Sequence, residues 1–550
     1  MLVLSCRRTV LRGESCIAAT LVSCLALAAP ALGQYDPQKA YKESDAVAAR
    51  YPDPAVEYKT PAFTFGKADF TAHAEMMSFL TALDQRSNTM RLRIAGQSQE
   101  GRDIPALLLT ASGGDAEFKD AARPTVLLIG QQHGDEPAGG EAMLALAQRL
   151  AEGDLAYLLE KINVVIVPRA NPDGAEAFKR TTKSGIDVNR DHTLQRTPEG
   201  QALGVLFREY EPNVVFDAHE FSVAGRWVTA FGGLQRIDAM IQYATTANIP
   251  SDLTGLQEDT FRQPLTKALD AAGLMHDWYY TTDASGKSKT ISMGGIGADT
   301  GRNVASLRNA VSFLMETRGV GMGRQHLKRR VHTHVVAIEA VLRSAADHAP
   351  EVVQRTDAFG KMIASIPAGS PFTILSAQTP EKRQITFVEP NTGADVVVDA
   401  DWRSALTIAP ELTRPRPAAY ILPPSEAGIA QRLRDLGVEV IQTTAQASIP
   451  VETYKVVALK EEAKADVRGT DEGAGDILKG QYALEVTEAD IPLGSYVVPL
   501  GQPLANLAGI VMEPESTVGY IANRLMAIPP SGVLPILRVR NSGDIAKLKT

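Results

Sequence analysis

Hydrophobic and polar positions in the first two thirds of the chain follow two alternating patterns. Short apolar runs typical of buried strands occur at residues 90–94, 104–110, 125–129, 162–167, 214–216 and 311–315. The apolar spacing typical of amphipathic helices occurs from about residue 68, at residues 141–150 and at residues 325–346. Strands that alternate with helices predict an α/β fold, in which helices cover a sheet.

The pattern changes beyond about residue 348. Short β-type runs broken by Pro and Gly follow at residues 372–376, 384–388 and 395–398. Further on, residues 420–422, 427–436 and 438–441 predict a small strand–helix–strand unit, and the polar residues 461–476 predict an exposed loop. We therefore expect an α/β domain at residues 66–348 and a β-rich α+β domain at residues 349–550, with no catalytic constellation in the second.

The first 33 residues have the pattern of a secretory signal peptide. Arg7, Arg8 and Arg12 precede an apolar stretch at residues 16–32, which closes on small residues before Gln34. This predicts export to the periplasm or outside the cell. The sequence around Cys24 also resembles a lipoprotein processing site, so lipid anchoring is the second interpretation. Residues 34–65, rich in Tyr, Pro and Asp, are expected to form an extended arm.

Composition narrows the candidate functions. At 550 residues, the chain predicts two or more domains. The net charge of −8 argues against a nucleic-acid partner, and no apolar run after the signal is long enough to cross a bilayer. All three cysteines lie in the first 33 residues, so His and carboxylates are left as ligands for a metal in the mature protein. The oligomeric state stays open.

Three polar clusters follow apolar strands of the predicted sheet. His133 and Glu136 come after the run at 125–129, His219 after that at 214–216, and Glu316 after that at 311–315. Ligands of open α/β sheets bind outside the carboxyl ends of the strands, so these clusters are expected to face one crevice. Taken singly, the first cluster is better explained by a helix cap, and His219 by a hydrogen-bonded core residue. Only their combination favours a shared site.

Two His and one carboxylate, with a fourth position left for water, form the ligand set of a catalytic zinc ion. We therefore expect one Zn²⁺ on His133, Glu136 and His219. A carboxylate such as Glu316, costly to bury at the end of an apolar strand, fits the role of the base that takes a proton from the water.

Arginines in the middle of the domain are candidates for holding a substrate. Arg180 follows the turn at residues 171–174, and Asn189 and Arg190 follow soon after. The planar guanidinium of Arg190 is suited to a terminal carboxylate, and Arg180 to an oxyanion. Surface ion pairs are the alternative interpretation of both arginines.

These residues, in this order, resemble the motifs of the zinc metallocarboxypeptidase family. The resemblance covers about residues 70–346 and implies a mixed sheet flanked by helices. It also implies zinc on His133, Glu136 and His219, oxyanion support from Arg180, carboxylate binding by Asn189 and Arg190, and Glu316 as the general base. The expected activity is hydrolysis of C-terminal peptide bonds.

The sequence departs from this family at two places. Asp135 stands where digestive members have Arg, and His-Gly-Asp-Glu is more similar to the branch of succinylglutamate desuccinylase and aspartoacylase, so an amidohydrolase of N-acyl amino acids or cell-wall peptides is the alternative. The family's late Tyr falls at Gly294 or Gly295, which leaves Tyr279 and Tyr280 as substitutes. Arg302 lies where the family shapes its side-chain pocket, which predicts a preference for acidic substrates. A structural turn at residues 299–303 is the alternative interpretation.

Overall fold

The structure, a computed structural model, describes residues 35–466, 469–470 and 475–548. The predicted signal peptide, including Cys24, lies outside these residues, so its prediction stands on the sequence alone. Within the described part of the chain, we find no helix with the length and apolar character needed to cross a membrane.

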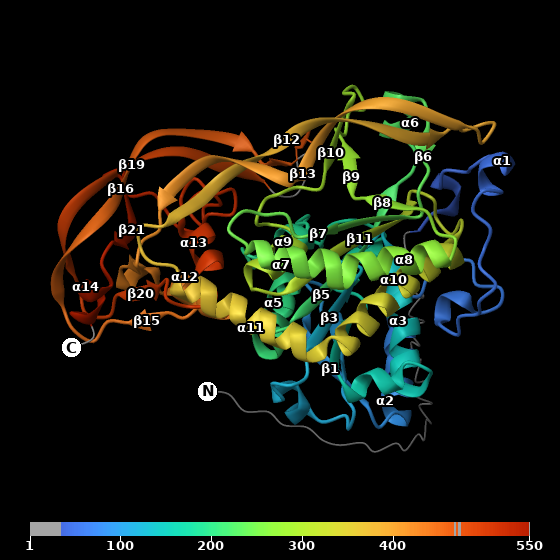
Figure 1. Cartoon of the computed structure of the whole chain (residues 1–550), viewed down its shortest axis with the longest axis horizontal. Helices are drawn as coiled ribbons and strands as arrows, with labels where there is room; N and C mark the ends of the chain where they lie inside the picture. Colours follow the sequence, from blue (N-terminus) through green and yellow to red (C-terminus); the bar gives the residue numbers. More distant parts are fainter. Residues whose placement is uncertain (1–34, 467–468, 471–474, 549–550) are drawn as a thin grey trace, which may run out of the picture. The chain divides into compact units, whose positions relative to one another are not determined.

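An eight-stranded mixed sheet lies at the centre of the N-terminal half (Figure 1). Its strands follow the order β1 (Met90–Gln97), β2 (Asp103–Leu109), β4 (Asn163–Val167), β3 (Thr125–Gly130), β5 (Val214–Ser222), β11 (Val311–Val320), β7 (Ala239–Tyr243) and β8 (His276–Trp278). The central strands β4, β3, β5 and β11 are parallel, whereas β2 and β7 join them antiparallel. The α/β fold with a mixed sheet is therefore confirmed.

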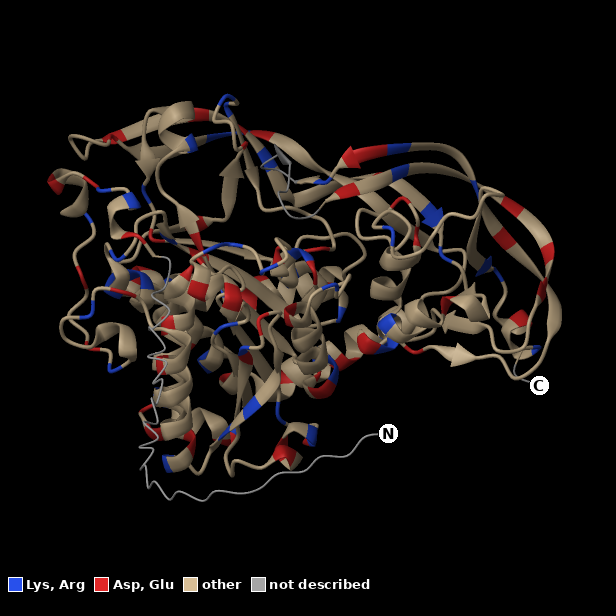
Figure 2. Cartoon of the chain, turned by 180° about the vertical axis from the view of Figure 1, so that it is seen from behind, with Lys and Arg blue, Asp and Glu red and all other residues tan. Residues whose placement is uncertain are grey.

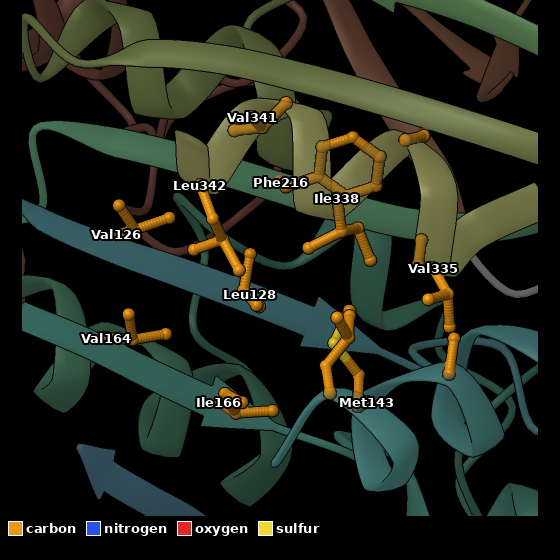
Figure 3. Packing of buried hydrophobic residues seen from close by; sticks show 14 of the residues in the cluster. Val126, Leu128, Met143, Val164, Ile166, Phe216, Val335, Ile338, Val341 and Leu342 are labelled. Carbon is orange, nitrogen blue, oxygen red and sulfur yellow. The ribbon is translucent and has the colours of Figure 1, made fainter. Parts of the chain in front are cut away.

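Helices cover both faces of this sheet, which explains its continuous apolar strands. One face packs against α2 (His73–Arg86), α3 (Pro137–Glu152), α8 (Gln263–Ala271) and α10 (Leu327–Asp347), and the other against α5 (Pro198–Tyr210) and α9 (Gly301–Leu307). Successive side chains of β3 point to opposite faces of the sheet. Val126 and Leu128 pack on the side of α3 and α10, and Leu127 and Ile129 on the side of α5 and α9. Figure 3 shows Leu128 beside Ile338 and Leu342 of α10.

Short helices complete this half of the described chain. They are α1 (Asp45–Ala48), α4 (Pro172–Ala177), α6 (Arg226–Phe231), α7 (Ser251–Leu256), the π-helical turn η6 (Gln257–Arg262) and the 3-10 helices η1 (Pro37–Lys39), η2 (Pro61–Phe63), η3 (Asp115–Lys119), η4 (Ala156–Glu160) and η5 (Val188–Arg190). Residues 35–64, expected to form an extended arm, contain only α1, η1 and η2.

A long hairpin connects the two halves of the chain. After α11 (Ala349–Ser365), the strands β12 (Pro371–Val388) and β13 (Asp395–Pro415) pair along their lengths. The hairpin joins β6 (Leu234–Gln235), β9 (Tyr280–Thr282) and β10 (Thr290–Met293) in a five-stranded sheet. The sequence predicted short separate runs here because Pro380 was interpreted as a break. The proline is tolerated because β12 is an edge strand over most of its length.

The remaining chain forms a six-stranded sheet. Its order is β15 (Ile441–Gln442), β20 (Tyr496–Pro499), β14 (Ala419–Leu422), β21 (Val533–Val539), β16 (Ala447–Ala463) and β19 (Asp476–Ile491), with helices η7 (Pro424–Glu426), α12 (Ala427–Asp435), α13 (Ala505–Met512) and α14 (Ser542–Ala546). Figure 2 shows acidic and basic residues interspersed along its long strands. The β-rich C-terminal region is confirmed, whereas a domain boundary at residue 348 stays a prediction.

Two local predictions in the C-terminal half were wrong. The expected strand at 438–441 is confined to Ile441, because the backbone of Glu439 hydrogen-bonds with the Gln502 side chain instead of a neighbouring strand. The expected loop at 461–476 instead begins and ends as the strands β16 and β19, with the short pair β17 (Ala465–Asp466) and β18 (Gly469–Thr470) between them. Residues 467–468 and 471–474 of this segment lie outside the described chain.

Candidate active site

The carboxyl ends of three central strands bring the predicted metal ligands together. Gly130, the last residue of β3, pairs with Ala218 of β5, and Gln131 then turns the chain with a φ of 49° into the loop that carries His133 and Glu136. On the other side of β5, the register with β11 places Glu316 directly beside His219. Parallel pairing in this register therefore gathers residues that are far apart in the sequence.

His133, Glu136 and His219 form a buried cluster of converging donor atoms. His133 Nδ1 lies 2.8 Å from Glu136 Oε1, and His219 Nδ1 lies 2.9 Å from Glu136 Oε2. The two Nδ1 atoms lie 3.0 Å apart. The three residues are at most 3% exposed. Among the described residues, this is the group of His and acidic side chains with the geometry to hold a metal ion.

Carboxylates on the outer side of both imidazoles set the orientation of the rings. His133 Nε2 lies 3.1 Å from Asp187 Oδ1, and His219 Nε2 lies 2.9 Å from Asp217 Oδ2. Charges and hydrogen bonds from these neighbours outweigh the effect of burial and hold the pKa of both aspartates below its usual range. An ionised carboxylate keeps the ring proton on Nε2, which leaves the Nδ1 lone pair for a metal.

This donor set fits zinc. Two Nδ1 lone pairs that face each other repel unless a cation lies between them, and a buried carboxylate beside them supplies the negative charge that a divalent ion needs. Two imidazoles with one carboxylate are the ligands of zinc sites that keep a position open for water.

Close backbone packing fixes the loop that carries His133. A Cβ atom at Gly134 would lie 1.9 Å from the carbonyl carbon of Gly174, so only glycine fits at this position. The Gly134 N–H also donates to the Arg180 carbonyl. The His-Gly-Asp-Glu segment therefore packs directly on the turn that leads to Arg180.

Arg180 reaches the metal ligands from this neighbouring segment. Its Nη1 lies 3.0 Å from His133 Nδ1 and 3.5 Å from Glu136 Oε1. Its Nε and Nη2 donate to Asp187 Oδ2 at 3.1 and 2.7 Å. Asp187 thus orients both a metal-ligand imidazole and a permanent cation, which places a positive charge beside the donor cluster.

Glu316 lines a cavity together with Glu136 and Arg180. The cavity has a volume of about 190 Å³, and Asp135, Glu136, Arg180, Tyr279 and Glu316 are among its lining residues. Burial and the neighbouring charge of Glu136 raise the pKa of Glu316 to about 7. A carboxyl group with this pKa exchanges protons readily near neutral pH.

The two tyrosines that the sequence left as alternatives have different environments. Both contact the cavity, but the Tyr280 hydroxyl donates to Gln235 Oε1 at 2.8 Å in the buried core. Tyr279 packs against Gly294, where a Cβ atom would lie 2.5 Å from its ring. Of the two, Tyr279 is therefore the candidate for contact with a substrate.

The predicted substrate-binding residues lie on the other side of His219. Asn189 is buried: its Oδ1 accepts from the Gly301 N–H at 2.7 Å, and its Nδ2 lies 3.1 Å from His219 Nε2. Arg190 instead lines a neighbouring cavity of about 390 Å³. Arg302 donates from Nη2 to the Gly295 carbonyl at 2.6 Å and also lies close to Gly294. The structure thus puts Arg190 and Arg302 near the metal-ligand cluster but outside the cavity of Glu316.

Two functional neighbours were missed at the sequence level. Asp187 and Asp217 stand two residues before Asn189 and His219, inside segments that were already singled out. Their signal was a carboxylate two residues before a predicted site residue, but which His each one contacts depends on the three-dimensional arrangement of distant segments.

Comparison with known proteins identifies the family. Residues 76–249 match the family model described as zinc carboxypeptidase. Carboxypeptidase 2 of Trichophyton equinum is 31% identical over 530 residues, which cover 92% of this chain and 95% of that protein. The probable carboxypeptidase 2 of Arthroderma benhamiae is 32% identical over 503 residues, covering 87% of this chain and 92% of that protein.

A solved structure, carboxypeptidase A from Helicoverpa armigera, aligns with a TM-score of 0.39 and 16% identity over 55% of this chain and 79% of that one. The family assignment stands on the sequence relatives, which match nearly the whole chain at more than 30% identity. With the sequence motifs gathered at one edge of the sheet, the protein belongs to the zinc carboxypeptidase family and is a zinc metallocarboxypeptidase.

Proposed function

We propose that this protein is an exported carboxypeptidase that removes the C-terminal residue from peptides, with one Zn²⁺ on His133, Glu136 and His219. The observation that carries the site assignment is the pair of Nδ1 atoms 3.0 Å apart beside the Glu136 carboxylate, with Asp187 and Asp217 at the outer ring nitrogens. Export is supported by the pattern of residues 1–33.

When bound, zinc supplies an electrophile that polarises the scissile carbonyl and makes water more acidic. Glu316 is the general base of the proposed mechanism. Its carboxylate takes a proton from water and returns it to the leaving amine, a role supported by its pKa of about 7 and by its position beside His219.

Arg180 stabilises the negative charge that develops on the carbonyl oxygen. Its guanidinium is held by the two hydrogen bonds that it donates to Asp187 and carries a permanent positive charge, so little reorganisation is needed during the reaction. Arg190 binds the terminal carboxylate of the peptide. Asn189 contributes by positioning the Gly301 backbone and His219, and its direct contact with the substrate stays a prediction.

The proposal is tested with a peptide and its C-terminally amidated twin. Purified protein should contain one zinc per chain and release the last residue of the free peptide but leave the amide intact, because Arg190 requires a carboxylate. N-acyl amino acids are assayed in parallel for the amidohydrolase alternative. Equal cleavage of the amide, or hydrolysis of acyl amino acids alone, contradicts a carboxypeptidase.

A further inference from the structure

The loop that follows Arg190 is bound by a helix of the C-terminal half. Residues 191–197 connect η5, which ends at Arg190, with α5, and α12 lies beside α5 (Figure 1). Arg432 of α12 donates from Nη1 to the carbonyls of Leu194 and Gln195, the second at 2.8 Å. One guanidinium therefore binds two successive carbonyls of the loop.

Further contacts attach the same loop to the C-terminal half. The Tyr520 hydroxyl donates to the Thr193 carbonyl at 3.4 Å, and Arg196 Nη2 donates to the Asn523 carbonyl at 2.5 Å. The Leu194 side chain is 3% exposed and packs in a hydrophobic cluster made mostly of C-terminal residues, Tyr520 among them. The loop is therefore attached to the core of the C-terminal half by packing as well as by hydrogen bonds.

Hydrogen bonds within the loop connect these contacts to Arg190. Asp191 directly follows Arg190 and is 1% exposed. Its carboxylate accepts from the N–H groups of Arg196 and Thr197, each at 2.8 Å, and its carbonyl accepts from the Gln195 N–H at 2.7 Å. Gln195 has a φ of 47°, a left-handed conformation that is costly for a residue other than glycine and persists only where neighbouring contacts maintain it. A shift at Gln195 would therefore move Asp191 and, with it, Arg190.

We propose that the C-terminal half positions the substrate-binding residues of the active site, and that Arg432 is the positioning residue that keeps Arg190 in place for the terminal carboxylate of a peptide. The inference rests on the proposed carboxypeptidase function, in which Arg190 binds that carboxylate. Arg432 acts through the loop. Loss of its hydrogen bonds weakens the binding of the carboxylate, whereas the zinc ligands and Glu316 are carried by β5, β11 and the loop after β3 and keep their geometry.

The test measures hydrolysis of a peptide with a free C-terminal Leu by wild type and by Arg432→Met. KM should rise about 10-fold in the variant, because the apparent affinity falls with the fraction of molecules whose binding site is in place. The kcat should change less than about twofold, since Arg190 contacts the carboxylate in the ground state and in the transition state alike. Inhibition by acetohydroxamate, a zinc ligand without a carboxylate, should be unchanged. Arg432→Lys keeps a donor for the loop carbonyls and should recover part of the wild-type KM.

Arg434→Met is the matched control. Arg434 lies on α12 two residues later, is half-buried like Arg432, and donates to the Val440 carbonyl of its own half at 3.1 Å. This variant should keep the wild-type KM. A wild-type KM in Arg432→Met, an equal rise of KM in both Met variants, or a loss of acetohydroxamate inhibition that accompanies the rise would each overturn the positioning role.

Trypsin gives a measurement that does not depend on peptidase activity. It cuts after Arg, so cleavage between Arg196 and Thr197 reports how often the loop leaves its place. Mass spectrometry should show this cut at least about fivefold faster in Arg432→Met than in wild type, and at the wild-type rate in Arg434→Met. If the wild-type protein cleaves no peptide, the proposed function fails, and the trypsin rates still show whether Arg432 holds the loop. Equal rates in all three proteins overturn the inference even where peptides are cleaved.

Discussion

Polar residues lie at different positions along the strands of the eight-stranded sheet and of the six-stranded sheet. All residues of β3 are buried, and the buried run of β5 extends through Phe221, because helices cover both faces. In β16 and β19, exposed and buried residues mix along the strands, and Val457 and Val486 are each 65% exposed. Polar residues of the first sheet are therefore concentrated at strand ends, whereas those of the second spread over a solvent face.

A buried charged residue does not by itself distinguish a functional site from a structural network of hydrogen bonds and ion pairs. In the C-terminal half, Glu513 is buried, accepts a hydrogen bond from the Tyr420 hydroxyl at 2.7 Å and pairs with Arg414 at 3.1 Å. The donors of Tyr420 and Arg414 thus meet acceptor oxygens of Glu513. At the end of β5, by contrast, two imidazole nitrogens of the same kind face each other, which indicates that a third partner is needed.

The largest expected effect tests whether Glu316 of β11 takes part in catalysis. Glu316→Gln keeps the shape of the side chain but removes its ability to accept the proton. We expect kcat/KM to fall by about 10³-fold, within the range of general-base contributions, while zinc content is unchanged. Steady-state peptide hydrolysis and metal analysis measure both. Wild-type activity in this variant would remove Glu316 from the mechanism.

The second prediction concerns Arg318, two residues beyond Glu316. It tests whether a charge at the same edge of the sheet stabilises the fold without taking part in catalysis. Arg318 Nη2 lies 2.9 Å from Glu43 Oε1 of the N-terminal arm, and His326 Nε2 lies 3.0 Å from Glu43 Oε2. Glu43→Gln leaves Arg318 without its carboxylate, so we expect a loss of about 3 kcal/mol in the free energy of unfolding at pH 7. Peptide hydrolysis under folding conditions should stay at the wild-type level.

This stabilisation depends on pH. Burial of Glu43 opposes its ionisation, but His326 and Arg318 outweigh it and hold the pKa of Glu43 below 4.5. The contribution of ionised Glu43 to the free energy of unfolding is therefore complete above its unfolded-state pKa. It is lost as the pH falls through the lower folded-state pKa. Urea unfolding of wild type and variant should converge at acidic pH. Glu57→Gln, at an exposed position of the arm, is the control.

The carboxylates behind the imidazoles give a smaller effect. Asp187→Asn should lower zinc affinity about 10- to 100-fold, because the amide holds His133 less firmly and no longer fixes its proton on Nε2. Competition with a zinc chelator measures the change. Asp173→Asn replaces a buried aspartate that binds Ser98 and Arg102 instead, and should leave zinc affinity unchanged. Equal losses in both variants would indicate general destabilisation.

The smallest effect compares the packing of the two sheets directly. Val126→Ala in the fully buried β3 removes two carbon atoms from the core and should cost about 1.6 kcal/mol. Val486→Ala, at a position of β19 that is 65% exposed, should change stability by less than about 0.5 kcal/mol. Urea denaturation of both variants measures the difference. Similar losses would contradict the contrast drawn between the two sheets.

The sequence already singled out the residues that the structure gathers at the strand ends, because their signals are local. A His and a Glu three residues apart, each cluster directly after an apolar run, can be recognised without a structure, and so can the strands at 125–129 and 162–167. The contacts of Asp187 and Asp217, and the choice of Tyr279 over Tyr280, depend on pairing between distant segments. The continuous strands β12 and β13 were missed because a proline at a sheet edge looks like a break.

The hairpin of β12 and β13 has a consequence for cleavage of the backbone. Its strands hydrogen-bond with β6 and β10 of the N-terminal half, at Phe387–Gln235 and Thr290–Asp401 among others. A protease nick between the two halves, for example after α11, would therefore leave two fragments that stay associated without any covalent connection. Such a nicked molecule would run as two bands on a denaturing gel yet migrate as one particle in gel filtration.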